Sequence, residues 1–420
     1  MIKLNPASLR FNAFLLLLLF QNAFSGHVEL GALSRAFAYF DEALAALAFA
    51  YCFRVAVTDK MRVKENVFLF IGISLVLTGI LSNFRAGLIR PKPMLIDAIA
   101  CFKFFVVLSA SICYFRCHKR TSKLIAGANS LCRALAFVSA TLVLVDIFIY
   151  EVFPGTDFRS FFRSQRLVFI HPSDLADFGI YLFSFLMLNN SKGKNTPYLI
   201  LDTIVIFSTM RHKQMAAVAV FWLLYFYYKL MKFHSNAIPL FCAGVISAFI
   251  SYDMLFLYYV SDIKTARGML MKVGLQIANA YFPLGTGLGN FASSAATVYY
   301  SPLYFKYGLN RVWGLGGDNM TFLSDTFWPI VFGQFGWVGF ALVSACFYAL
   351  FKMCFRLQKQ GANLRFICFY GLVLYLLCMS FGLPCLFHVS SVTTAILLSI
   401  IYSTTKAGKN EKKYTLDVFC

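Results

Sequence analysis

Long apolar runs separated by short charged turns set the pattern of this sequence. Runs of roughly 17–25 residues recur along the chain, and this is the length that a helix needs to cross a hydrocarbon layer of about 30 Å. The pattern therefore predicts about twelve membrane-spanning helices, of which the seventh is short. The predicted spans are residues 11–24, 37–57, 67–83, 94–115, 124–150, 173–188, 196–210, 214–230, 237–259, 324–351, 366–381 and 388–402.

The composition supports a membrane protein. Of the 420 residues, 60% are hydrophobic and only 13% are charged, and the mean hydropathy is +0.70. A soluble chain of this length cannot bury so much apolar surface in one core. We therefore expect an all-α, polytopic integral membrane protein whose residues 1–420 form a single domain. The sequence shows no internal repeat, so the pseudo-symmetry common in transporters has no support here.

The basic residues predict the direction of the spans. With the amino terminus inside, about 22 Lys and Arg fall on inner segments and about 14 on outer ones, as the positive-inside rule requires. Both termini are then cytoplasmic, and residues 261–323 form a large outer loop. Arg85, Arg90 and Lys92 break the rule because they fall outside. The first run, 11–24, is either a cleaved signal peptide or an uncleaved helix, and a chain that keeps crossing the membrane favours the helix.

The net charge of +20 also suggests binding to nucleic acid. Retention of Lys and Arg next to anionic lipid on the cytoplasmic side is the simpler explanation. We therefore expect membrane lipid, and not nucleic acid, as a partner.

The outer loop has the composition of a substrate site. It is long, rich in aromatic residues and poor in charge, whereas disordered segments have the opposite composition. Its glycines at Gly285, Gly287 and Gly289 predict a backbone turn at the membrane surface, where glycine permits tight packing and the close approach of a ligand. The run lacks the spacing and the following Lys-Ser or Lys-Thr of a nucleotide loop. We interpret the loop as one wall of a substrate site.

Three basic residues border this loop or the neighbouring outer turn. Arg211 and Lys213 lie between two predicted spans, and Arg267 begins the large loop. One interpretation is that they are interfacial cations whose side chains reach lipid phosphates. Their outer position, which the charge rule does not favour, indicates instead a phosphate site. A guanidinium binds phosphate through paired hydrogen bonds and does not lose its charge.

The loop also carries an aromatic cluster. Tyr299, Tyr300, Tyr304 and Tyr307 lie close together in the sequence, followed by Trp313. They form either an interfacial aromatic belt or stacking platforms for sugar rings, which have apolar faces and polar edges. The clustering favours a carbohydrate ligand.

The acidic candidates of this region are Asp318 and Asp325. Asp325 either caps the helix that follows it or acts as a general base toward a sugar hydroxyl. His388, at the start of the last span, is a further candidate for substrate binding and proton transfer. The loop has no paired carboxylates of the DxD type and the chain has no CxxC pair, so we expect neither a metal nor a cofactor.

Charged residues also occur within the predicted spans. Asp97 and Lys103 both lie in the fourth span, and charges at this depth are usually paired inside a helix bundle. Their separation of six positions does not place them on one helix face. We therefore expect each of them to have a different partner.

Six blocks of the sequence carry a family resemblance. They resemble the O-antigen and capsular polysaccharide polymerases, which share a superfamily with the O-antigen ligases. The resemblance covers most of the chain in layout and is specific mainly between residues 209 and 340. The blocks are YFDE (39–42), TMRHKQ (209–214), ARGML (266–270), FPLGTGLGNF (282–291), YYSPLYFKYGL (299–309) and DTFWPIVFGQFGWVGF (325–340).

The resemblance implies a metal-independent glycosyltransferase of the multi-helix, GT-C-like type in the bacterial inner membrane. Its implied substrate is an oligosaccharide repeat linked to undecaprenyl diphosphate, and its active site faces the periplasm or cell exterior. A chain-length regulator is an implied partner. The family arginines that bind the diphosphate map onto Arg211 and Arg267. The ligases carry His-Asn where this chain has Asp325-Thr326, which favours a polymerase. A ligase, or a flippase or other transporter of lipid-linked sugars, remains the alternative.

Overall fold

The computed structural model describes most of the chain as α-helix. The described residues are 6–25, 29, 31–58, 66–117, 121–149, 151–153, 157–159, 162–231, 252, 256 and 265–403. The longer helices are α1 (Pro6–Phe24), α3 (Phe40–Thr58), α4 (Val67–Ala86), α5 (Pro91–Cys117), α6 (Thr121–Phe148), α7 (Pro172–Leu188), α8 (Thr196–Ser208), α9 (His212–Met231), α11 (Ala266–Ala280), α15 (Gly336–Lys359), α16 (Asn363–Met379) and α17 (Ser390–Ser403). The short elements are α2 (Ala32–Ala38), β1 (Phe158–Arg159), β2 (Phe162–Arg163), α12 (Ser294–Val298), α13 (Pro302–Lys306), η4 (Leu309–Arg311), α14 (Phe327–Ile330) and the π-helical η5 (Val331–Phe335).

Helices occur wherever a predicted span falls on described residues. The ninth predicted span, 237–259, lies outside the described residues apart from 252 and 256. Five of the described helices are long and apolar enough to cross a membrane. They are residues 6–24, 67–86, 91–116, 123–148 and 327–359. The expectation of an all-α membrane protein is confirmed at this level.

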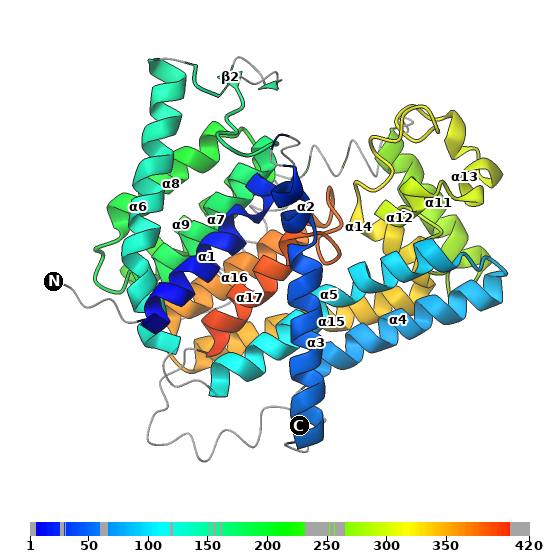
Figure 1. Ribbon diagram of the computed structural model, residues 1–420, viewed down its shortest axis with the longest axis horizontal. Helices are drawn as coiled ribbons and strands as arrows, with labels where there is room; N and C mark the ends of the chain where they lie inside the picture. Colours follow the sequence, from blue (N-terminus) through cyan, green and yellow to red (C-terminus); the bar gives the residue numbers. More distant parts are fainter. Residues whose placement is uncertain are drawn as a thin grey trace.

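Helix α5 joins the two sides of the bundle. In Figure 1, α1, α6, α7, α8, α9, α16 and α17 gather on the left, and α4, α15 and α11–α14 lie on the right. Helix α5 packs against α17 on one side and against α3 and α4 on the other. Its central part has an almost continuous run of buried residues, which includes Phe104, Phe105 and Leu108. The apolar residues around the whole circumference of this segment explain its central position, because a helix that is apolar on all sides is buried.

The predicted outer loop is largely folded. Its described part begins with the helix α11, whose amino terminus is capped by Thr265: the Thr265 side chain accepts a hydrogen bond from the backbone N–H of Gly268. The short helices α12 and α13 follow, and Ser293 and Ser301 directly before them cap each helix in the same way. The hydropathy pattern does not predict these helices, because each is only five residues long.

Two of the three basic residues that are exceptions to the predicted charge rule bind this folded segment. Arg85 donates to the backbone carbonyl of Phe282, and Arg90 donates to the carbonyl of Tyr299 and, at 3.5 Å, to that of Gly289. The carbonyls are the negative ends of backbone dipoles, so they favour a guanidinium beside them. The exceptions to the positive-inside pattern therefore have a structural partner.

Candidate functional site

The first part of the candidate site is an ion pair between Arg267 and Asp325. Arg267 is the second residue of α11, and Asp325 precedes α14 by two residues. The Nε of Arg267 donates to Oδ2 of Asp325 at 3.0 Å, and Nη2 donates to the same oxygen. Both side chains are partly exposed, at 19% and 24%. The pair therefore fixes the beginnings of two helices next to each other, at a place that solvent or a ligand can reach.

Asp325 does not act as a helix cap. Thr326 occupies the cap position of α14, and no side-chain hydrogen bond is made there. Burial raises the pKa of the Asp325 carboxyl above its ordinary value, and the positive charge of Arg267, together with its hydrogen bonds, opposes that rise. The sequence allowed Asp325 to be either a helix cap or a general base, and the structure excludes the helix cap. The role of general base stays a prediction.

Arg211 lies in the tight turn between α8 and α9. The turn is held by the preceding chain, where the hydroxyl of Ser164 donates to the carbonyl of Thr209 at 2.7 Å and the N–H of Gln165 donates to that of Ser208 at 2.9 Å. Met210 adopts a positive φ of 53° and so turns the chain sharply into α9. Arg211 is only 8% exposed. Its guanidinium is therefore placed by the backbone on both sides and does not move freely at a lipid surface.

A second carboxylate meets Arg211 from the hairpin formed by β1 and β2. Asp157, next to β1, makes an ion pair with the Nη2 of Arg211. The Nε2 of His171 lies 3.4 Å from the same nitrogen, and the side chain of His171 caps α7 by accepting from the N–H of Ser173. Arg211 thus connects the hairpin with the amino termini of α7 and α9.

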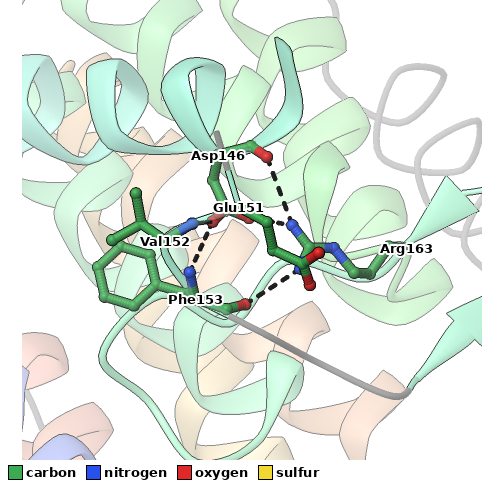
Figure 2. A network of polar contacts seen from close by, with 5 residues as sticks. All are labelled: Asp146, Glu151, Val152, Phe153 and Arg163. Atoms are coloured by element: carbon green, nitrogen blue, oxygen red, sulfur yellow. Dashed lines mark hydrogen bonds and ion pairs between the residues drawn. The ribbon is translucent and has the colours of Figure 1, made fainter. Parts of the chain in front are cut away.

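The hairpin is pinned to the end of α6 by a polar network. Figure 2 shows Arg163 between Asp146 and Glu151, with ion pairs to both carboxylates. Asp146 also accepts from the N–H groups of Val152 and Phe153, each at 2.7 Å. The Asp146 carboxylate is fully buried and Glu151 is 55% exposed, so Asp146 contributes most of the attachment. This network positions the strand that carries Asp157.

Lys213 follows Arg211 by two residues and lies near the second ion pair. Its ammonium is within electrostatic range of Arg267, Asp325 and Asp177. The Lys213 side chain packs against Gly382, since a Cβ added at Gly382 would be only 1.8 Å from the Lys213 nitrogen. Within the described part of the chain, Lys213 makes no ion pair at 4 Å or less. The positive charge of Lys213 at the start of α9 thus lies close enough to Arg267 for the two to act on one ligand.

Two pairs of helix amino termini are linked in this part of the molecule. His171 and Arg211 connect the starts of α7 and α9, and the ion pair of Arg267 connects the starts of α11 and α14. The N–H of Phe327 in α14 donates to the carbonyl of Ser380, next to the end of α16. Each helix amino terminus carries a partial positive charge. The helix ends and the three basic side chains favour an anion, and the carboxylates of Asp157 and Asp325 offset part of their charge.

The sequence did not indicate the acidic residues beneath the cations. Asp174 accepts from the side chain of Asn22 at 3.2 Å and interacts electrostatically with Arg211. Asp177 accepts from Gln214 at 2.8 Å and from the hydroxyl of Tyr375. Two carboxylates three positions apart in an apolar span are a signal that could have identified them, because charges in a span are costly unless they have a role.

Gly287 lies in a packed turn. It has a φ of 89°, and a Cβ there would be 2.3 Å from Cγ of Asn83. The N–H of Gly287 donates to the carbonyl of Gln334 in η5 at 2.9 Å. The tight backbone packing expected of the glycine run is therefore confirmed. The residue is buried, so its part in substrate binding stays an indirect one, through the shape of the turn.

The tyrosines of the loop do not share one environment. Tyr304 is completely buried, and its hydroxyl accepts from the N–H of Ala292 at 2.9 Å, which leaves no ring face for a sugar. Tyr300 is half-buried against Tyr304 and donates to the carbonyl of Leu315 at 2.9 Å. Tyr299 is 37% exposed. Among the three tyrosines predicted to bind substrate, Tyr299, Tyr300 and Tyr304, Tyr299 is therefore the most accessible.

Asp318 and His388 lie apart from the two ion pairs. Asp318 is exposed in the turn that follows η4 and interacts electrostatically with Tyr300. His388 precedes α17, and its Nδ1 lies 2.9 Å from the hydroxyl of Ser390. Burial, together with the neighbouring charge of Lys103, lowers the pKa of His388 to about 4. The imidazole is therefore neutral at physiological pH.

The expectation that Asp97 and Lys103 have different partners is confirmed. Lys103 makes an ion pair with Asp41 on α3. Asp97 accepts from the N–H of Gly289 at 2.8 Å, from Gln334 at 2.8 Å and from the hydroxyl of Ser293. Asp97 thus anchors the glycine turn to η5 and to α5.

The described residues include no group of three or more His, Cys, Asp or Glu that could hold a metal ion. Comparison with known proteins gave no matching family model and no significantly similar curated protein.

Proposed function

We propose that this protein is a polysaccharide polymerase. It transfers a growing glycan from undecaprenyl diphosphate onto the terminal sugar of another lipid-linked repeat. As part of the proposal, about twelve spans cross a bacterial inner membrane in a GT-C-like arrangement. Both termini are cytoplasmic, and the site described above faces the outer side. No metal or cofactor takes part, and a chain-length regulator is a partner.

One observation carries the proposal. Arg211 and Lys213 come from the turn that begins α9 and Arg267 comes from the start of α11, and Lys213 lies within electrostatic range of Arg267 and Asp325. Basic side chains next to helix amino termini, in an otherwise apolar helical protein, suit a ligand with a lipid tail and a diphosphate that can replace their carboxylate partners. A diphosphate is also the activated leaving group that glycosidic bond formation needs where no ATP is present.

The reaction is a substitution at the anomeric carbon of the donor. The acceptor hydroxyl oxygen forms a bond to this carbon, the bond from the carbon to the phosphate oxygen breaks, and the diphosphate leaves with the electron pair. Negative charge on the diphosphate therefore grows in the transition state. Fixed guanidinium groups bind it more tightly then than in the ground state, which lowers the barrier. One such donor contributes roughly 3–4 kcal/mol, or a hundredfold or more in rate.

Asp325 takes the proton of the acceptor hydroxyl in this mechanism. In the empty site both donors of Arg267 that contact Asp325 bind the same oxygen, Oδ2. A bound diphosphate competes for Arg267, so its arrival weakens the ion pair. The carboxylate then loses its stabilising cation and becomes a stronger base beside the substrate. Donor binding and activation of the base are thereby coupled.

The proposal is tested by changing Arg211 or Arg267 to Ala in the native host. We expect long-chain polysaccharide to disappear while single repeats remain on the lipid or on the core, as seen by gel electrophoresis of the extracted glycans. Arg311→Ala is the matched control, because Arg311 is an exposed arginine of the same folded loop. It should leave the chain length unchanged.

Normal long chains from stably inserted Arg211→Ala and Arg267→Ala variants would contradict the proposal. Deletion of the gene separates the two related enzymes. A strain without a ligase attaches no repeat to the core, whereas a strain without a polymerase still attaches one.

A further inference from the structure

The turn between η4 and α14 displays one large aromatic side chain to solvent. Trp313 is 74% exposed, whereas Tyr304 of the same loop is fully buried. Trp313 therefore adds little to the core, and its indole face is open to a ligand. The sequence placed Trp313 in the same cluster as the tyrosines, and the structure shows that it differs from Tyr304 in its exposure.

The backbone of this turn is braced. The N–H of Phe322 donates to the carbonyl of Gly314 at 3.0 Å, and the carbonyl of Leu315 accepts from the Tyr300 hydroxyl at 2.9 Å. Gly314 has a φ of 81°, and a Cβ there would be 2.4 Å from the Phe322 ring. Asn319 closes the turn by accepting from the N–H and the hydroxyl of Thr321. The position of Trp313 is thus set before any ligand binds, which reduces the entropy cost of binding.

An aromatic contact connects Trp313 to the candidate site. The ring of Trp313 lies 5.5 Å from that of Phe322, measured between centroids. The guanidinium carbon of Arg267 lies 5.8 Å from the centroid of the same Phe322 ring. Phe322 is therefore shared between the exposed indole and the arginine that we assign to the diphosphate. A ligand that begins at Arg267 and continues outward passes next to Trp313.

The polar surroundings of Trp313 fit a sugar. Asp318 and Thr321 on the same turn are exposed. A pyranose ring has an apolar face that stacks on an aromatic ring and hydroxyls at its edge that bond to carboxylates and hydroxyls. An exposed indole in a turn that also carries an exposed carboxylate and hydroxyl offers both kinds of contact.

We infer that Trp313, supported by Phe322, is the subsite for a sugar ring close to the diphosphate of the lipid-linked donor. This inference rests on the proposed function for the neighbouring diphosphate, and it assigns the sugar contact to Trp313 in place of the buried Tyr304. Trp313 sets how well the glycan part is held, whereas Arg267 acts on the leaving group. The alternative occupant, a lipid headgroup at the membrane surface, is an outcome of the test below.

The test uses the full-length protein in detergent and the oligosaccharide released by mild acid from the lipid-linked pool of the native host. This probe has neither lipid nor diphosphate. We expect it to bind the wild-type protein in a saturable way, as measured by isothermal titration calorimetry, a readout that does not depend on the Trp313 indole. Trp313→Ala should weaken binding of the oligosaccharide about tenfold, near the upper end of an aromatic contact. Trp313→Phe should keep most of the affinity, and the control Trp337→Phe should bind like the wild type.

The inference is overturned if Trp313→Ala binds the oligosaccharide as well as the wild type, or if the wild type does not bind it. It is also overturned if brominated lipid, and not the oligosaccharide, quenches Trp313. A second readout separates this result from the proposed function. If the protein is a polymerase without this subsite, Trp313→Ala makes polymer with an unchanged KM; if the subsite exists without the polymerase, the oligosaccharide binds but no polymer forms.

Discussion

At the scale of single residues, the candidate site is defined by arginines that already have carboxylate partners. Arg211 pairs with Asp157 and Arg267 pairs with Asp325. Such pairs hold the guanidinium groups in fixed orientations, so less order has to be imposed when an anion replaces the carboxylate. They also keep the empty site close to neutral, which lowers the cost of cations at the end of an apolar bundle.

The first prediction concerns the pH dependence of the transfer reaction. A base works only when it is ionised, so kcat/KM should fall as the pH falls through the pKa of Asp325. Burial raises this pKa and Arg267 lowers it. Replacing Arg267 by Gln removes the lowering influence, so the acidic limb of the profile should move to higher pH. The measurement is the initial rate of polymer formation over about pH 4–8.

The same series includes Asp325→Asn, whose rate should drop by about 10²–10⁴-fold because no carboxylate takes the proton. An acidic limb that stays in place in Arg267→Gln would contradict the assignment. So would an Asp325→Asn variant that keeps the full rate.

The residues show how far the sequence could predict the site. Arg211, Lys213, Arg267 and Asp325 stand out as charges at the ends of apolar runs. The sequence does not reveal which carboxylate pairs with which arginine. Asp157 lies 54 positions from Arg211, and only the folded hairpin places the two side chains in contact. Tyrosines in an aromatic-rich segment look alike in sequence whether they are buried, as Tyr304 is, or open to solvent.

At the scale of the helices and strands, hydropathy was the reliable guide. A lipid environment forces spanning segments to satisfy their backbone internally, so long apolar runs form helices. The helices of the segment predicted as an outer loop, α11, α12 and α13, depend on caps and on contacts with α5, η4 and η5. These contacts have no periodic signature in the sequence.

The hairpin of β1 and β2 gives a prediction at this scale. Asp146→Ala removes the acceptor of the N–H groups of Val152 and Phe153 as well as the partner of Arg163. Loss of one partner of a buried charged network costs about 3–5 kcal/mol locally. Hydrogen exchange should therefore become much faster at the amides of Val152 and Phe153.

Glu151→Ala is the matched control, because Glu151 binds the same arginine from an exposed position. An exposed pair contributes about 0–1 kcal/mol, so these amides should exchange nearly as in the wild type. Equal protection in both variants would show that Asp146 does not hold the hairpin.

At the scale of the whole molecule, distant segments converge on one end of the bundle. The turn between α8 and α9, the start of α11, the start of α14 and the connection from α16 to α17 meet around Lys213. The sequence placed the first two on the outer side through charge alone, and it placed Arg85 and Arg90 there as exceptions. Their bonds to the folded loop give those exceptions a reason that a charge count cannot supply.

The central claim is that this convergence of cations binds a lipid diphosphate and drives glycan transfer. In the most direct measurement, purified protein in detergent is mixed with lipid-linked repeats from the native host. Polymer length and the release of undecaprenyl diphosphate are then followed over time. Detergent removes all compartments, so a flippase yields no product. We predict polymer, one diphosphate released for each bond formed, and a rate lower by a hundredfold or more in Arg267→Ala. A folded wild-type protein that makes no polymer, or an Arg267→Ala variant with the wild-type rate, would contradict the account.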